Sequence, residues 1–242
     1  MRRGPKETPK LEYARAAFWA CNLSHVSGMS FTELERLLTP WAVKPRDGGG
    51  YLQPYAFKKY ATGQRIPTTK GDRSPIRLAE NHFPGSITAY KSILWDVIAI
   101  EPGNRSGIDL NELCSRTNRE VIKELKNGFF QQNSKPILNQ MGILKVRTIK
   151  HVDAFALLLL TMRLSEVITI KDVYDLQSCL LFNSAHPPFS TCAELLLNIF
   201  EEIIPELGVM TGPLGFIENN HNSHISTLTA ALTCGRHIKL EW

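Results

Sequence analysis

The chain has 242 residues, of which 43% are hydrophobic and 21% are charged, so it is long enough to bury a sizeable core. These values exclude the disordered, collagen-like and disulfide-rich classes of protein. The charge is uneven, because residues 1–100 contain 15 Lys and Arg against 8 Asp and Glu, whereas the remainder contains 13 against 15. A basic first part joined to a near-neutral second part favours a polyanionic partner for the first part.

The cysteines and the apolar runs predict where the protein resides. The five cysteines are scattered and contain no Cys-x-x-Cys pair, which favours a reducing, cytoplasmic location over a disulfide framework. The basic start of the chain is not followed by an apolar stretch, so we expect no secretory signal. The longest apolar run, 154–160, is too short to cross a bilayer, and we expect a soluble protein without a membrane partner.

The first 40 residues predict a basic arm followed by two helices. Residues 1–10 carry four Lys or Arg and two prolines and predict a flexible arm. A helix is expected over 11–23, ended by Gly28. The sequence Ser-Phe-Thr-Glu at 30–33 is a capping box, and it predicts a helix to about residue 38. We expect that helix to turn Leu34, Leu37 and Leu38 inward and to stop at Pro40.

The next segment predicts a glycine-rich loop over 41–53 and a third helix over 55–62. Pro54 suits the first position of that helix, and Gly63 suits the left-handed residue that ends it. Further helices are expected over 75–83 and 87–98. The polar, Pro- and Gly-containing stretch 101–107 is the best linker candidate.

The second part of the chain predicts a packed helical domain. Asp109 and Glu112 favour a helix to about residue 126, and weak alternation predicts a strand over 143–149. Three apolar helices are expected over 153–167, 169–181 and 191–204, and a last one over 225–232. The expected fold is therefore mainly α, with domains at 11–100 and 108–242.

Two segments of the basic part carry the functional argument. The first is Gly-Met-Ser-Phe-Thr-Glu-Leu at 28–34, and the second is Phe-Lys-Lys-Tyr-Ala-Thr-Gly-Gln-Arg-Ile-Pro at 57–67. Here the chain resembles the helix-turn-helix domains of the Cro and phage-repressor family. The resemblance implies that residues 11–100 contain a helix-turn-helix-like DNA-binding domain whose second helix lies in the major groove. It differs by an insertion, since 18 residues separate Leu38 from Phe57 where the family has a short turn.

The basic and polar side chains of this region have the chemistry of DNA contacts. Lysines neutralise phosphates, whereas Gln and Arg make bidentate contacts to base edges. The N-terminal arm is expected to follow the minor groove, the insertion to form a wing on the backbone, and the tyrosine to reach a base edge or a phosphate. The candidate DNA-binding residues are Arg2, Arg3, Lys44, Arg46, Tyr55, Lys58, Lys59, Gln64 and Arg65.

Catalytic and metal-binding patterns give no comparable signal. His221, His224, Cys234 and His237 have donor types that suit zinc, but surface histidines and a buried thiol account for them better. The glycines at 48–50 lack the Gly-Lys-Ser/Thr end of a phosphate loop, and Gly-x-Ser-x-Gly is absent from the sequence. We therefore expect no enzymatic activity and no cofactor.

The sequence thus predicts a cytoplasmic transcriptional regulator that occupies double-stranded DNA. The domain at 108–242 is expected to form a homodimer or to receive a protein partner, because repressors of this kind read paired half-sites. The alternative is a non-enzymatic interaction subunit of a defence or toxin–antitoxin type complex that binds RNA or protein. A purely structural helical domain also fits the composition.

Overall fold

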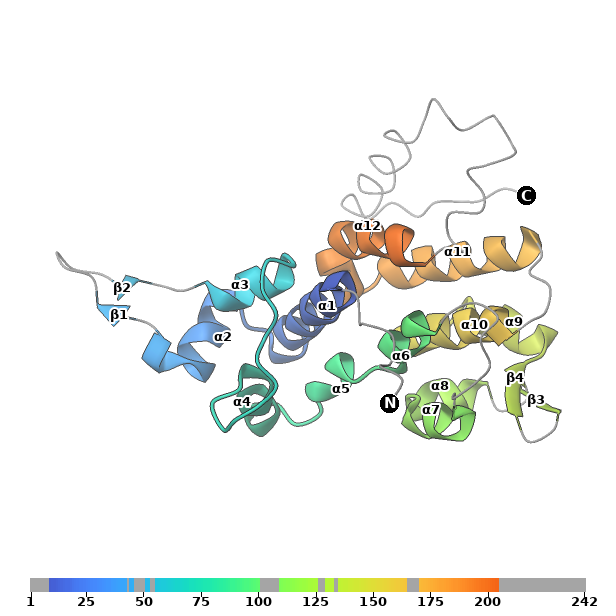
Figure 1. Cartoon of the computed structure of the whole chain (residues 1–242), viewed down its shortest axis with the longest axis horizontal. Coiled ribbons are helices and arrows are strands. Elements are labelled where there is room, and N and C mark those ends of the chain that lie inside the picture. The colour runs from blue at the N-terminus through green and yellow to red at the C-terminus, as the bar shows by residue number, and fades with distance from the viewer. Residues whose placement is uncertain are drawn as a thin grey trace, which may run out of the picture. The chain divides into compact units, whose positions relative to one another are not determined.

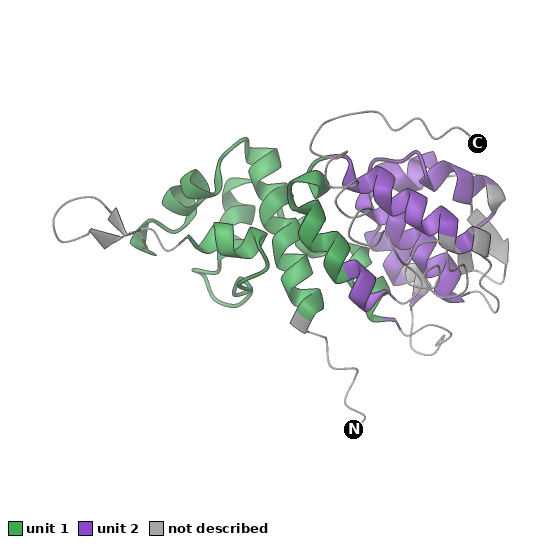
Figure 2. Ribbon diagram, turned by 90° about the horizontal axis from the view of Figure 1, so that it is seen from above, with its two compact units in different colours: residues 1–99, 187–199 green, residues 100–186, 200–242 purple. Residues whose placement is uncertain are grey.

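The fold is mainly helical, as predicted, in a computed structural model that describes residues 9–42, 44–45, 51–52, 55–100, 109–125, 129–132, 135–164 and 170–204 (Figure 1). The chain divides into two compact units (Figure 2). Unit 1 comprises residues 1–99 and 187–199, and unit 2 comprises residues 100–186 and 200–242. Within the described ranges, no helix combines the length and the apolar character needed to cross a membrane.

Helix α1 (Pro9–Ser27) forms the core of unit 1. Most of its apolar side chains are buried, as expected for a helix that is covered on several sides. It packs against α3, α5 and the 3₁₀ helix η2. The other elements of unit 1 are α2 (Phe31–Leu38), η1 (Pro40–Ala42), α3 (Ala56–Ala61), α4 (Pro75–His82), α5 (Ile87–Tyr90), α6 (Ile93–Ala99), η2 (Phe189–Cys192) and the start of α12 (Ala193–Ile203).

Aromatic contacts bring the late segment 187–199 into unit 1. The Phe18 ring lies edge-on to the Phe189 ring, with 5.9 Å between the ring centroids, and the same distance separates Phe18 from Trp95. The sequence analysis places 187–199 in the domain at 108–242, whereas the structure packs this segment with α1. A contact between residues so far apart in the chain leaves no local pattern in the sequence.

The insertion between α2 and α3 contains a short β-hairpin. Strand β1 (Lys44–Pro45) pairs antiparallel with β2 (Tyr51–Leu52), with Lys44 opposite Leu52 and Pro45 opposite Tyr51. The sequence predicts a loop over 41–53, and we also expected this segment to form a wing that contacts the DNA backbone. Within that stretch the structure describes the 3₁₀ helix η1 and this pair of strands, and residues 43, 46–50 and 53 lie outside the described residues.

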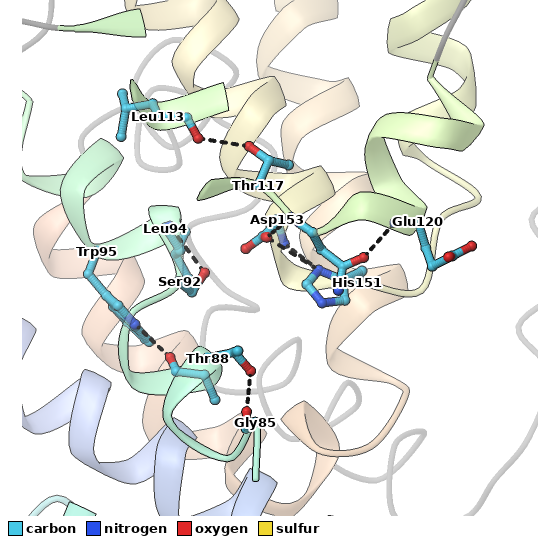
Figure 3. A network of polar contacts seen from close by, with 12 residues as sticks. Gly85, Thr88, Ser92, Leu94, Trp95, Leu113, Thr117, Glu120, His151 and Asp153 are labelled. Atoms are coloured by element: carbon cyan, nitrogen blue, oxygen red, sulfur yellow. Dashed lines mark hydrogen bonds and ion pairs between the residues drawn. The ribbon is translucent and has the colours of Figure 1, made fainter. Parts of the chain in front are cut away.

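In unit 2 the elements surround the apolar helix α10 (Val152–Leu164). Its side chains from Leu157 to Leu160, within the apolar run 154–160, are all buried. The other elements are α7 (Leu110–Arg116), α8 (Arg119–Glu124), β3 (Phe129–Gln132), β4 (Lys135–Leu138), α9 (Gln140–Val146) and α11 (Ile170–Ser184). The start of α10 is tied to α8 by the buried Asp153, whose carboxylate accepts from the Asn118 backbone amide at 2.8 Å. Figure 3 shows His151 beside Asp153, and the Thr117 hydroxyl donating to the Leu113 carbonyl oxygen at 3.0 Å.

Two predicted helices are each divided by a polar side chain. The helix expected over 87–98 is divided into α5 and α6, and the Ser92 hydroxyl accepts from the Leu94 amide at 3.2 Å. The helix expected over 109–126 is divided into α7 and α8, and the Asn118 side chain accepts from the Glu120 amide at 2.8 Å. Ser and Asn compete for backbone donors in this way and so start new helices.

Three further expectations from the sequence are wrong. The strand expected over 143–149 is largely the helix α9, whereas the strands of this region are β3 and β4. Leu37 is 38% exposed, because Leu34 and Leu38 already fill the inner face of α2. The expected arm is shorter than ten residues, since Pro9 and Lys10 belong to α1.

Gly63 is constrained by its backbone and by its packing. Its φ is +64°, and a Cβ built on it would lie 3.0 Å from Leu195 Cδ2. Gly28 has a similar φ of +67° and nothing within 4 Å. A Cβ built on Gly28 meets no described atom within 4 Å, so we expect Gly28→Ala to lower the free energy of unfolding by about 1–2 kcal/mol through backbone strain alone. Gly63→Ala should lower it further, because its Cβ also meets Leu195.

Urea denaturation of both variants measures this difference. Adding Leu195→Ala to Gly63→Ala removes the close atom and is expected to recover the difference from Gly28→Ala after correction for Leu195→Ala alone. Equal losses for Gly63→Ala and Gly28→Ala would show that the Leu195 contact adds nothing.

Candidate nucleic-acid interface

The buried carboxylate of Glu35 fixes the start of α3. Glu35, on α2, is only 3% exposed, and both of its oxygens accept from the Ala56 amide, at 2.9 and 3.0 Å. Burial raises the pKa of Glu35, and the Ala56 hydrogen bond together with the charges of Arg65 and Lys59 opposes that rise. The carboxylate therefore links α2 directly to the start of α3.

The start of α2 is fixed by the capping box that the sequence predicted. The Ser30 amide donates to Glu33 Oε2 at 2.8 Å, and the Glu33 amide donates to the Ser30 hydroxyl at 3.3 Å. The Ser30 hydroxyl and amide lower the pKa of Glu33, so this carboxylate keeps its charge to lower pH than usual. The capping box is confirmed.

The inner face of α3 is anchored by aromatic rings. Phe57 and Tyr60 are buried, and their centroids lie 5.9 and 6.1 Å from that of Trp19 on α1. Burial raises the pKa of the Tyr60 hydroxyl. A helix of six residues is not stable in isolation, so these contacts hold α3 in place.

The end of α3 is closed as the sequence predicted. The Gly63 amide donates to the Tyr60 carbonyl oxygen at 3.0 Å, and the Gln64 amide donates to the Lys59 carbonyl oxygen at 2.8 Å. This is the Schellman arrangement, in which a left-handed glycine ends the helix. It directs the chain after residue 63 away from the helix axis, and both Gln64 and Arg65 are exposed there.

The outer face of α3 carries Lys58 and Lys59, both exposed. Thr62, three and four residues after the lysines, is also exposed on their side of the helix, and Tyr55 is exposed directly before α3. Tyr55 is 52% exposed and has a φ of +51°, in the left-handed region. We call Tyr55, Lys58, Lys59 and Thr62 the α3 face.

The segment after α3 extends the positive charge. Residues 55–77 contain six Lys or Arg and one acidic residue, Asp72. Asp72 accepts from Arg77 at 2.8 Å, and both side chains are exposed. The Arg65 guanidinium lies 6.0 Å from the Tyr60 ring centroid, so it remains beside α3. The charge here faces solvent, where it can meet phosphate groups.

Glu35, Trp41, Lys70 and Arg73 lie in this region but are absent from the candidates predicted from the sequence. Lys70 and Arg73 lie in the exposed loop before α4, and the Arg73 guanidinium lies 5.6 Å from the ring centroid of Trp41. The sequence did not identify Glu35 as a candidate, because nothing in the sequence of α2 indicates that its carboxylate accepts a hydrogen bond from the Ala56 amide. The only signal for Lys70 and Arg73 was the run of basic residues itself.

The structure brings together five of the nine predicted contact residues. Tyr55, Lys58, Lys59, Gln64 and Arg65 lie on α3 or directly beside its ends. Lys44 is in β1, and Arg2, Arg3 and Arg46 lie outside the described residues. The same holds for His221, His224, Cys234 and His237, and in the part that is described no cluster of three His, Cys, Asp or Glu could hold a metal ion.

Comparison with known proteins adds no family assignment. No protein-family model, curated protein or solved structure matches the chain. The chemistry of the α3 face is therefore argued from this molecule alone.

Replacement of Glu35 tests how α3 is held. Glu35→Leu leaves the Ala56 amide buried without an acceptor, and we expect a loss of about 1–3 kcal/mol in the free energy of unfolding. Glu35→Gln keeps an oxygen for that amide without the charge, and it should retain most of the stability at pH 7. Urea denaturation of the parent and of both variants gives these values.

The pH dependence of the same variants tests the raised pKa. A pKa that is higher in the folded than in the unfolded state contributes stability below the unfolded value, and this contribution is lost as the pH rises through the folded value. The parent should therefore gain stability relative to Glu35→Gln as the pH falls from neutral to about 4. A difference that is constant with pH would show that Glu35 is not desolvated.

Proposed function

We propose that the protein binds double-stranded DNA through the α3 face and acts as a transcriptional regulator by occupying its site. The observation that carries this proposal is that α3 buries Phe57 and Tyr60 on one side and exposes Lys58 and Lys59 on the other. A helix fits the major groove, and lysines beside it neutralise the phosphates on the groove's edges.

The packing around α3 supports this proposal. Helix α2 packs against α3, and both helices contact α1. In the helix-turn-helix arrangement that the sequence resembles, the first helix crosses the DNA backbone while the second enters the groove. This packing holds α3 in place and so favours contacts between α3 and DNA, because groups that are already fixed lose less entropy on binding.

The length of α3 favours a homodimer. Six residues extend about 9 Å along a helix axis, and this length corresponds to about three base pairs. Two copies would read two half-sites and extend the recognised sequence. We propose that unit 2 supplies the dimer contact or receives a protein partner, and that occupancy of the site needs no catalytic group.

A double replacement on the α3 face tests the proposal. Lys58→Ala with Lys59→Ala is expected to weaken binding to every duplex and to reduce the slope of log K against log salt concentration by about 2. The matched control is Lys123→Ala with Lys150→Ala, which removes the same charge from exposed positions of unit 2. Fluorescence anisotropy with a labelled duplex at several salt concentrations gives the slopes.

The control separates the position of the charge from its amount. If both double variants change the slope equally, only net charge matters and the α3 face is not the binding surface. If the parent binds no duplex at low salt, the proposed function is wrong.

Gln64 and Arg65 test sequence preference separately. Replacing either by Ala should reduce discrimination against a wrong base by about 1–3 kcal/mol while leaving the salt slope closer to that of the parent. The matched control is Thr69→Ala, at an exposed position of the loop before α4. Selection from random duplexes, followed by affinities for single-base variants, measures the discrimination. An unchanged preference in both variants would place base readout elsewhere.

A further inference from the structure

Two aromatic side chains of unit 1 remain half exposed although most of its aromatic rings are buried. Trp41, in η1, is 50% exposed, and Tyr55, before α3, is 52% exposed. The buried rings of unit 1 are Phe18, Trp19, Phe57, Tyr60, Tyr90, Trp95 and Phe189. Aromatic side chains that are exposed to solvent can stack on the bases of a nucleic acid.

Trp41 and Tyr55 flank the base of the hairpin. The pairing of Lys44 with Leu52 places Trp41 three residues before the first strand pair and Tyr55 three residues after it. The chain therefore enters the hairpin at one aromatic residue and leaves it at the other.

Trp41 is held against a cation. The Arg73 guanidinium lies 5.6 Å from the Trp41 ring centroid. The backbone next to Arg73 is held by Ser74, whose hydroxyl donates to the Thr68 carbonyl oxygen at 2.5 Å. Because the carboxylate of Asp72 is paired with Arg77, the guanidinium of Arg73 is left to Trp41 and to solvent among the described interactions.

Tyr55 is held in a conformation that a tyrosine rarely adopts. Its φ of +51° lies in the left-handed region, which is an outlier for a bulky side chain. The Tyr55 side chain makes no capping hydrogen bond to α3, and the adjacent Ala56 amide is fixed by Glu35. Such strained positions cluster at binding sites, where the surrounding structure maintains them.

We propose that Trp41, Tyr55 and Arg73 form a stacking site for an unpaired nucleobase beside the α3 face; this inference rests on the proposed function. Aromatic rings stack on bases of any sequence, and a nearby guanidinium adds attraction for the same nucleotide. Bases inside a regular duplex stack on one another, so their faces are covered. The ligand class is therefore duplex DNA that contains an unpaired nucleotide.

The experiment compares two labelled duplexes of the same sequence, one fully paired and one with a single unpaired nucleotide near its centre. We expect the full chain to bind the second about tenfold more tightly, as stacking of one base on an aromatic ring provides. Trp41→Leu and Tyr55→Gly should each reduce this ratio to about one. The affinity of Trp41→Leu for the paired duplex should stay within about twofold of the parent, because Trp41 lies outside the α3 face and the phosphate contacts of that face remain.

Control variants separate loss of the ring from loss of the fold. Tyr55→Gly relieves the left-handed strain, so it should unfold at a temperature no lower than that of the parent. Leu37→Ala, at another exposed apolar position of unit 1, should keep the tenfold ratio. Tyr55→Phe retains the aromatic ring, so this variant should also keep the tenfold ratio.

The outcomes distinguish this inference from the proposed function. A parent protein that binds both duplexes equally overturns the stacking site and leaves duplex binding in place. A parent protein that binds neither overturns both. If Trp41→Leu and Tyr55→Gly both retain the preference, the unpaired base is recognised elsewhere and the assignment of these three residues is wrong.

Discussion

The hydrogen bond from the Ala56 amide to the Glu35 carboxylate is the contact on which the interface depends. It joins α2 to α3 across 21 residues of chain, and it does so with a buried charge. A buried carboxylate is costly unless hydrogen bonds and nearby cations compensate it. Here Arg65 and Lys59 supply part of that compensation from the solvent side. The charged form of Glu35 is therefore favoured by the same cations that give this region its positive charge.

Packing supplies what a helix of six residues lacks. The Trp19 ring contacts Phe57 and Tyr60, and its indole Nε1 is buried with no hydrogen-bond partner among the described residues. Beside Gly63 lies Leu195, which is 132 residues later in the chain. Helix α3 is held by contacts at its start, along its inner face and at its end, and its outer face is left to solvent.

Local signals in the sequence were sufficient for the helix ends but not for the tertiary contacts. The capping box at Ser30 and the glycine at 63 were predictable, because each acts within four or five residues of itself. The pairs Glu35–Ala56 and Trp41–Arg73 were not, because a single sequence contains no sign of which distant residue a side chain meets. Leu37 was wrongly predicted to be buried for a related reason. Helical spacing is compatible with a buried Leu37, and only the packing of α2 against its neighbours determines that the side chain is exposed. The lysines of α3 were predictable as exposed, since Phe57 and Tyr60 define the opposite face.

Under the proposed function, Lys59 and Arg65 take part both in DNA binding and in the stabilisation of the buried Glu35 carboxylate. A phosphate group near Lys59 or Arg65 would attract the same cations that offset the burial of Glu35, so DNA and the carboxylate compete for them. Loss of that compensation favours protonation of Glu35, and a protonated carboxyl group still offers its carbonyl oxygen to the Ala56 amide. The contact that positions α3 can thus persist while the cations turn outward. A buried acid in this place is compatible with a surface that binds polyanions, because its hydrogen bond does not require its charge.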